Sequence, residues 1–111
     1  MKVFRIEDQE GLGPFRGSIN RYLEAAARHD GPWIWKSKEI KNQVFVKLKE
    51  NWIFGFNTEE ILFYVFDLDF NELAQHKYVL ATYEASDFLI GEEGQVVFNR
   101  TTATLLSSIP F

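Results

Sequence analysis

Several short segments of this chain are built from strand-forming residues, and two of them alternate side-chain character with a two-residue repeat. The alternation runs through Lys2–Glu7 and Tyr78–Glu84, while Trp52–Phe56 and Gln95–Phe98 are short apolar runs. A two-residue repeat places successive side chains on opposite faces of a strand. These segments therefore predict a sheet, and the turn residues Gly91–Gly94 favour two adjacent antiparallel strands within residues 78–98.

Two other stretches have the spacing of helices. Ile19, Tyr22, Leu23 and Ala26 recur on one helical face, which predicts a helix over residues 18–28 behind the N-cap Ser18. A second helix is expected to begin at Thr58.

The start of that second helix carries a capping signal. Asn57 is the expected N-cap and Glu60 the acidic partner of a capping box. Asp67–Asp69 is expected to end the helix, and a short helical turn is expected over Asn71–Gln75.

These elements together predict one α+β domain over residues 1–111. Its sheet is expected to be mostly antiparallel, with four or five short strands and two helices. Residues 39–49 fit either a strand or a helix, and the tail Thr101–Phe111 is a candidate edge strand.

Aromatic residues make up 16% of the 111 residues, enough ring surface to fill the core of a small domain. The chain has no cysteine, which excludes disulfides and thiolate chemistry. Because no apolar run reaches the length of a membrane span and no leader is recognisable, a cytoplasmic protein is expected.

Charge is distributed unevenly along the chain. Residues 1–50 hold ten basic and seven acidic residues, whereas residues 51–94 hold nine acidic residues and one lysine. An acidic half fits a basic, nucleic-acid-binding surface on another protein, although the same charges also serve solubility. The overall acidity argues against direct binding of duplex nucleic acid.

Two groups of residues are candidates for binding a protein partner. Trp33 and Trp35 follow a Gly–Pro break, where large rings act either as plugs over the core or as anchors at an interface. The second group is acidic and spans the predicted helices: Glu59, Glu60, Asp67, Asp69 and Glu72.

The common catalytic motifs are missing. Pro14 follows Gly11-Leu12-Gly13 and removes an amide that a phosphate-binding loop would use, and no serine lies in a nucleophile elbow. The two histidines, His29 and His76, have no second ligand at metal spacing. No metal or cofactor is expected from these features.

One arrangement resembles, at a distance, that of ADP-ribosyltransferases, in which an early Arg, a Ser or Thr and a late acidic residue or Gln surround NAD. The resemblance implies that Arg5 binds the dinucleotide, Thr58 supplies the polar group and Gln95 takes the late position. A glutamine there lacks the carboxylate that stabilises a developing cation, so weak catalysis or none is implied.

The chain more broadly resembles small bacteriophage accessory proteins. The segments that carry this resemblance are Phe4–Glu7, Gly11–Arg16, Phe54–Asn57, Tyr83–Glu84 and Gly94–Phe98. It implies a viral protein in the host bacterial cytoplasm, in a class that includes inhibitors of host defence such as anti-CRISPR proteins.

The sequence therefore predicts a non-enzymatic, phage-type protein that binds and inhibits a host protein through its acidic residues and aromatic rings. The alternatives are a small ADP-ribosyltransferase-like enzyme or NAD-binding protein, and a phage structural or assembly factor that forms closed oligomers.

Overall fold

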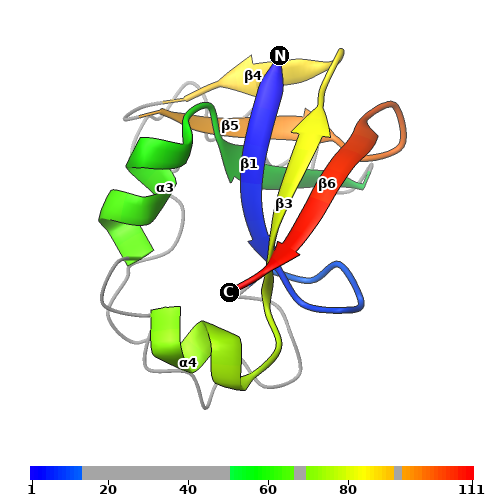
Figure 1. Cartoon of the computed structure of the whole chain (residues 1–111). Helices are drawn as coiled ribbons and strands as arrows, with labels where there is room; N and C mark the ends of the chain where they lie inside the picture. Colours follow the sequence, from blue (N-terminus) through cyan, green and yellow to red (C-terminus); the bar gives the residue numbers. More distant parts are fainter. Residues whose placement is uncertain (14–50, 67–69, 92–93) are drawn as a thin grey trace.

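The structure is a computed structural model of the chain, and it describes residues 1–13, 51–66, 70–91 and 94–111. Two helices and six strands lie in these residues (Figure 1). In chain order they are β1 (Lys2–Glu7), β2 (Trp52–Phe56), α3 (Glu59–Phe66), α4 (Phe70–Gln75), β3 (Val79–Glu84), β4 (Phe88–Ile90), β5 (Gln95–Asn99) and β6 (Thr104–Pro110).

The six strands form one sheet in the order β4-β5-β2-β1-β3-β6, and every neighbouring pair is antiparallel. The antiparallel α+β architecture is as predicted, but the number of strands is higher than the four or five expected. The additional strand is β4, a three-residue run inside the connection after Ser86. The predicted edge strand in the tail is confirmed as β6.

The prediction that residues 78–98 form two adjacent strands is wrong. β3 pairs with β1 and β6, while β5 pairs with β2 and β4. β1 and β2 therefore lie between β3 and β5 in the sheet. Pairing partners are chosen by contacts between distant segments, and closeness in sequence is only a weak guide to them.

The sheet is strongly bent. Three neighbour steps separate β3 from β5, which would be about 14 Å in a flat sheet. The ring centroids of Tyr83 on β3 and Phe98 on β5 are nonetheless 5.3 Å apart. In Figure 1, β1, β3 and β6 accordingly run across the direction of β2, β4 and β5.

Gly55 allows β1 and β2 to approach closely at this bend. A Cβ atom on Gly55 would collide with the Val3 side chain and lie 2.9 Å from the carbonyl oxygen of Phe4. Only a residue without a side chain fits between these two strands at this point.

The bend separates two apolar clusters. Inside the bend, the buried residues are Val3, Ala81, Tyr83, Ala85, Val96 and Phe98. The other face of the sheet packs against the helices, where the buried residues are Ile6, Leu62, Phe66, Leu73, Tyr78 and Leu80. Phenylalanine rings complete this second cluster. The ring centroid of Phe70 lies 5.5 Å from that of Phe63 and 5.4 Å from that of Phe111.

Helix α3 begins one residue later than predicted. Thr58, not Asn57, is the N-cap, because its Oγ1 accepts a hydrogen bond from the backbone N–H of Ile61 at 3.2 Å. The Asn57 N–H instead donates to the carbonyl of Gly94 at 2.8 Å, which ties the start of the helix to β5. Glu60 is therefore not the acidic partner in a capping box.

Helix α4 confirms the predicted helical turn and begins one residue earlier. It ends at Gln75, and Lys77, two residues further on, adopts a positive φ of 62° that turns the chain away from the helix. His76 lies directly after the end of this helix. The predicted helix over residues 18–28 and the open assignment of residues 39–49 lie outside the described residues.

Candidate functional site

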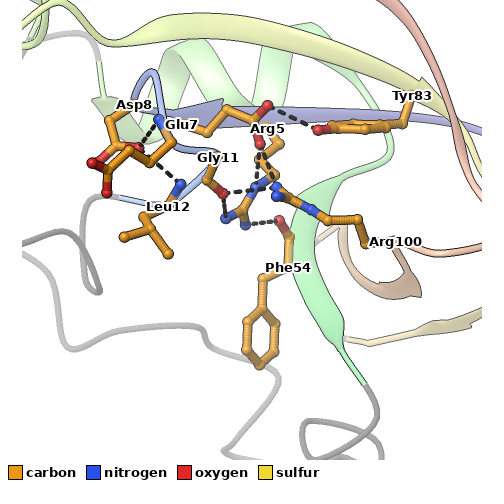
Figure 2. A network of polar contacts seen from close by, with 9 residues as sticks. Arg5, Glu7, Asp8, Gly11, Leu12, Phe54, Tyr83 and Arg100 are labelled. Carbon is orange, nitrogen blue, oxygen red and sulfur yellow. Dashed lines mark hydrogen bonds and ion pairs between the residues drawn. The ribbon is translucent and has the colours of Figure 1, made fainter.

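The most developed polar arrangement among the described residues is a cluster of charged side chains inside the bend of the sheet. It begins with Arg5 and Glu7, which are two residues apart on β1 and therefore point to the same face. Figure 2 shows that Tyr83 from β3 and Arg100, just after β5, reach the same point. We call Arg5, Glu7, Tyr83 and Arg100 the β1 cluster.

Glu7 is the centre of the β1 cluster. Its Oε2 accepts hydrogen bonds from Arg5 Nε at 2.9 Å and from Arg100 Nη2 at 2.7 Å. Its Oε1 accepts the hydroxyl hydrogen of Tyr83 at 2.8 Å. The carboxylate is thus bound by three donors, while its side chain is only 8% exposed. A buried charge needs such partners to offset its loss of hydration.

The turn after β1 and strand β2 supply the remaining acceptors. The carbonyl of Gly11 accepts from Arg5 Nη2 at 3.1 Å and from Arg100 Nη2 at 2.7 Å, and Arg5 Nη1 donates to the Phe54 carbonyl at 2.8 Å. Asp8 holds the turn in shape, because its Oδ1 accepts from the N–H groups of Glu10 and Leu12.

Gly11 is required at this turn for two reasons. Its φ is 81°, in the left-handed region, and a Cβ atom there would collide with Nη1 of Arg100. The sequence gave no sign that the backbone carbonyl of Gly11 binds two guanidinium groups.

The electrostatics of the β1 cluster are those of a buried structural network. Burial lowers the pKa of Arg5, and the neighbouring Glu7 opposes that shift. Burial and the hydrogen bond to Glu7 raise the pKa of Tyr83 to about 12, so its hydroxyl stays protonated at neutral pH. The Tyr83 hydroxyl therefore serves as a hydrogen-bond donor to Glu7 at neutral pH.

The residues of the NAD-binding hypothesis lie as follows. Phe4, Phe56 and Gln95 form one row across β1, β2 and β5, so they share a face. Arg5 follows Phe4 and therefore faces the opposite side of the sheet from Gln95. Thr58 caps α3. This geometry does not bring Arg5 and Gln95 together, and the dinucleotide-binding role stays a prediction.

The acidic residues proposed to bind a partner are only partly described. Glu59 and Glu60 are exposed in the first turn of α3, and Glu72 on α4 is half-buried. Asp67 and Asp69, like Trp33 and Trp35, lie outside the described residues.

The sequence reasoning missed Tyr64 on α3. Its side chain is 81% exposed, the highest value among the large exposed apolar residues of the described part of the chain. Tyr64 follows Glu60 by four residues, so the two lie on one side of the helix. The signal was present in the sequence, because Tyr64 falls outside the apolar stripe formed by Ile61, Leu62, Val65 and Phe66.

Two further features were sought in the described residues, a metal site and a membrane-spanning helix. No group of three or more histidine, aspartate or glutamate side chains lies there in an arrangement that could hold a metal ion. Within the same residues, neither helix has the length and apolar character needed to cross a membrane.

Comparison with known proteins gives a family for the chain. It matches the family model described as "Bacteriophage T4 Y00F protein" over residues 1–111. The chain therefore belongs to this phage protein family, which confirms the phage part of the resemblance drawn from its sequence. Neither the curated proteins nor the solved structures contain a match.

Proposed function

We propose that this member of the Bacteriophage T4 Y00F family is a non-enzymatic accessory protein that binds and inhibits a host protein. The contact is made through the exposed side of helix α3. We call Glu59, Glu60 and Tyr64 the α3 surface.

The observation that carries the proposal is the exposure of Tyr64. A tyrosine ring that is 81% exposed gains little from burial in its own fold. Tyrosine is among the residues most enriched in the energetically important centres of interfaces, because a rigid ring offers much contact area at little entropic cost. Its position on the same side of the helix as the exposed carboxylate of Glu60 supports a partner contact.

Charge supports a basic partner. The α3 surface lies in the segment 51–94, which carries nine acidic residues and one lysine. Such a surface accelerates encounter with a positively charged patch and discriminates against acidic proteins. Host proteins that bind nucleic acid, including defence proteins, present patches of this kind, and occupying one would compete with the nucleic acid.

Glu59 and Glu60 also have a simpler role that the test must separate. Carboxylates in the first turn of a helix stabilise it by about 0.3–1 kcal/mol through the helix dipole. A variant at these positions therefore informs on binding only if its unfolding midpoint is measured alongside. Tyr64 has no such role at a helix start, so it is the sharper probe.

The experiment uses the immobilised full chain to capture proteins from a lysate of host bacteria, followed by binding kinetics on the captured protein. We expect Tyr64→Ala to increase the dissociation rate at least tenfold. Glu59→Gln combined with Glu60→Gln is expected to slow association and to flatten its dependence on salt.

Two matched controls accompany these variants. Glu10→Gln removes an exposed carboxylate from the turn after β1, and Ile90→Ala removes a side chain that is 53% exposed on β4. Both should bind as the wild type does. If Tyr64→Ala binds as tightly as the wild type, the α3 surface is not the contact.

Inhibition is tested on the captured protein itself. We expect the wild-type chain to displace nucleic acid from it, and the double glutamine variant to do so less effectively. The predicted contributions of Trp33, Trp35, Asp67 and Asp69 are tested in the same assay by substitution to alanine or asparagine. A captured protein that binds nucleic acid equally well with and without the chain would contradict the inhibitory role.

A further inference from the structure

Strand β6 forms an open edge of the sheet. It pairs with β3 on one side, and it is the last strand in the sheet order (Figure 1). All seven of its residues are exposed. Its outer row of backbone N–H and C=O groups therefore faces solvent in the part of the chain that the structure describes. Such an edge is a template for pairing with another strand.

Apolar side chains project from both faces of this edge. Leu105 pairs with Tyr83, which belongs to the cluster inside the bend, and Ile109 pairs with Leu80, which belongs to the cluster under the helices. Leu105 is 52% exposed and Ile109 is 56% exposed. A flat partner would cover only one of these faces, whereas an added strand places its own side chains beside both.

The edge carries no charge. No acidic or basic residue occurs in Thr104–Pro110, or anywhere in residues 101–111, although the chain as a whole has a net charge of −4. Edge strands of monomeric proteins are commonly guarded by charged side chains, above all lysine. The same strand of a second copy is equally uncharged, so pairing of the two edges buries no charged side chain of either strand.

We propose that the protein forms a two-fold dimer through antiparallel pairing of β6 with β6 of a second copy. Two-fold pairing closes on itself at two copies, whereas pairing of β6 with the opposite edge, β4, would add further copies into rings or open filaments. In the dimer the two sheets become one continuous sheet, and no carboxylate of this strand has to be desolvated. This proposal is independent of the contact through α3.

The dimer is expected to be reversible. A β-bulge interrupts the register of β6 against β3 between Thr82 and Tyr83, and Pro110 at the end of the strand has no N–H to donate. Regular pairing is thus confined to the few residues around Ser108, which makes a small interface. The association should accordingly depend on concentration.

Sedimentation velocity over a dilution series of the full chain tests the proposal. We expect the wild type to shift from monomer to dimer as concentration rises, and Ile109→Lys to weaken the association at least tenfold. The matched control is Ile90→Lys, which places the same charge at a similarly exposed position on the β4 edge. This control should dimerise as the wild type does.

A second measurement reads the backbone directly. Amide hydrogen exchange of Ser107–Ile109 is expected to slow as the protein concentration rises, while exchange in β4 stays constant. A chain that sediments as a monomer at every concentration overturns the proposal, as does a dimer that survives Ile109→Lys and is lost in Ile90→Lys. Circular dichroism of each variant establishes that it is folded, and Leu105→Lys replaces Ile109→Lys if the latter is not.

Discussion

Replacing Glu7 by glutamine tests the role of the β1 cluster, because it removes the charge and keeps the shape. Glutamine retains an oxygen where Arg5 Nε and Arg100 Nη2 donate, and an amide group next to the Tyr83 hydroxyl, which can rotate to accept. The hydrogen-bond geometry therefore survives. What is lost is the only negative charge that faces two guanidinium groups within the cluster.

The expected cost follows from the burial of Arg5, whose side chain is only 9% exposed. Breaking a buried ion pair by removing one partner costs about 3–5 kcal/mol, because the remaining charge stays buried without compensation. Since glutamine keeps the hydrogen bonds, we expect the lower end, about 3 kcal/mol. In a domain of this size, that lowers the unfolding midpoint by roughly 12–24 °C.

Urea denaturation followed by circular dichroism measures this loss. The control is Glu84→Gln, because Glu84 is 53% exposed and meets the N-terminal ammonium at 3.4 Å, a surface pair expected to contribute less than about 1 kcal/mol. In an Arg5→Met background, Glu7→Gln should lower the free energy of unfolding clearly less than in the wild type, because the buried guanidinium of Arg5 is no longer left without a counter-charge. A loss below about 1 kcal/mol, or an equal loss in both backgrounds, would refute the reasoning.

Two further predictions concern Tyr83 and Arg5. Burial and the hydrogen bond to Glu7 raise the pKa of Tyr83 in the folded state to about 12, above the value of about 10 in an unfolded chain. The stability that this shift contributes is therefore fully present below pH ~10 and is lost as the pH rises towards 12. Urea denaturation in steps across this window should therefore show a shallower decline for Tyr83→Phe than for the wild type, and equal declines would contradict the assignment. The guanidinium of Arg5 already donates to Glu7, Gly11 and Phe54. We therefore expect millimolar NAD to leave the thermal unfolding midpoint unchanged in the wild type and in Arg5→Ala. A rise of the midpoint in the wild type alone would favour the NAD-binding alternative.

The elements of this fold were predictable where their signals are local. The alternation of Lys2–Glu7, the apolar run Trp52–Phe56 and the helix start near Thr58 each depend on a few neighbouring residues, and each appears in the structure within one residue. Strand β4 was missed because three apolar residues carry no period of their own. It exists because β5 offers an edge against which Phe88–Ile90 can pair.

The order of the strands was not predictable by the same means. β1 lies between β2 and β3, and the chain reaches β5 only after β3 and β4. No local pattern in Tyr78–Phe98 indicates that its two main strands, β3 and β5, lie three positions apart in the sheet. The bend of the sheet brings Tyr83 and Phe98 back into contact. This bend depends on the packing of all the strands and cannot be read from one segment.

The contacts of the β1 cluster were likewise not predictable from local sequence patterns. The alternation of Lys2–Glu7 is consistent with Arg5 and Glu7 sharing a strand face, but the sequence assigned Arg5, by resemblance, only to dinucleotide binding. The other hydrogen-bond partners of Glu7 are Tyr83 and Arg100, which lie 76 and 93 residues away from it in the sequence. Two neighbouring charges on a strand do not indicate whether side chains from distant parts of the chain will also form hydrogen bonds with them.

The β1 cluster also fixes the register of the sheet. A slip of β1 by one residue would turn Arg5 and Glu7 towards the apolar cluster under the helices, where Leu62 and Phe66 offer no partner for a charge. The native register alone joins β1, β3 and the turn after β5 around one carboxylate. Because Arg5, Glu7 and Arg100 bind one another inside the bend, the contacts that we propose with other molecules are assigned instead to exposed elements of the described residues, helix α3 and strand β6.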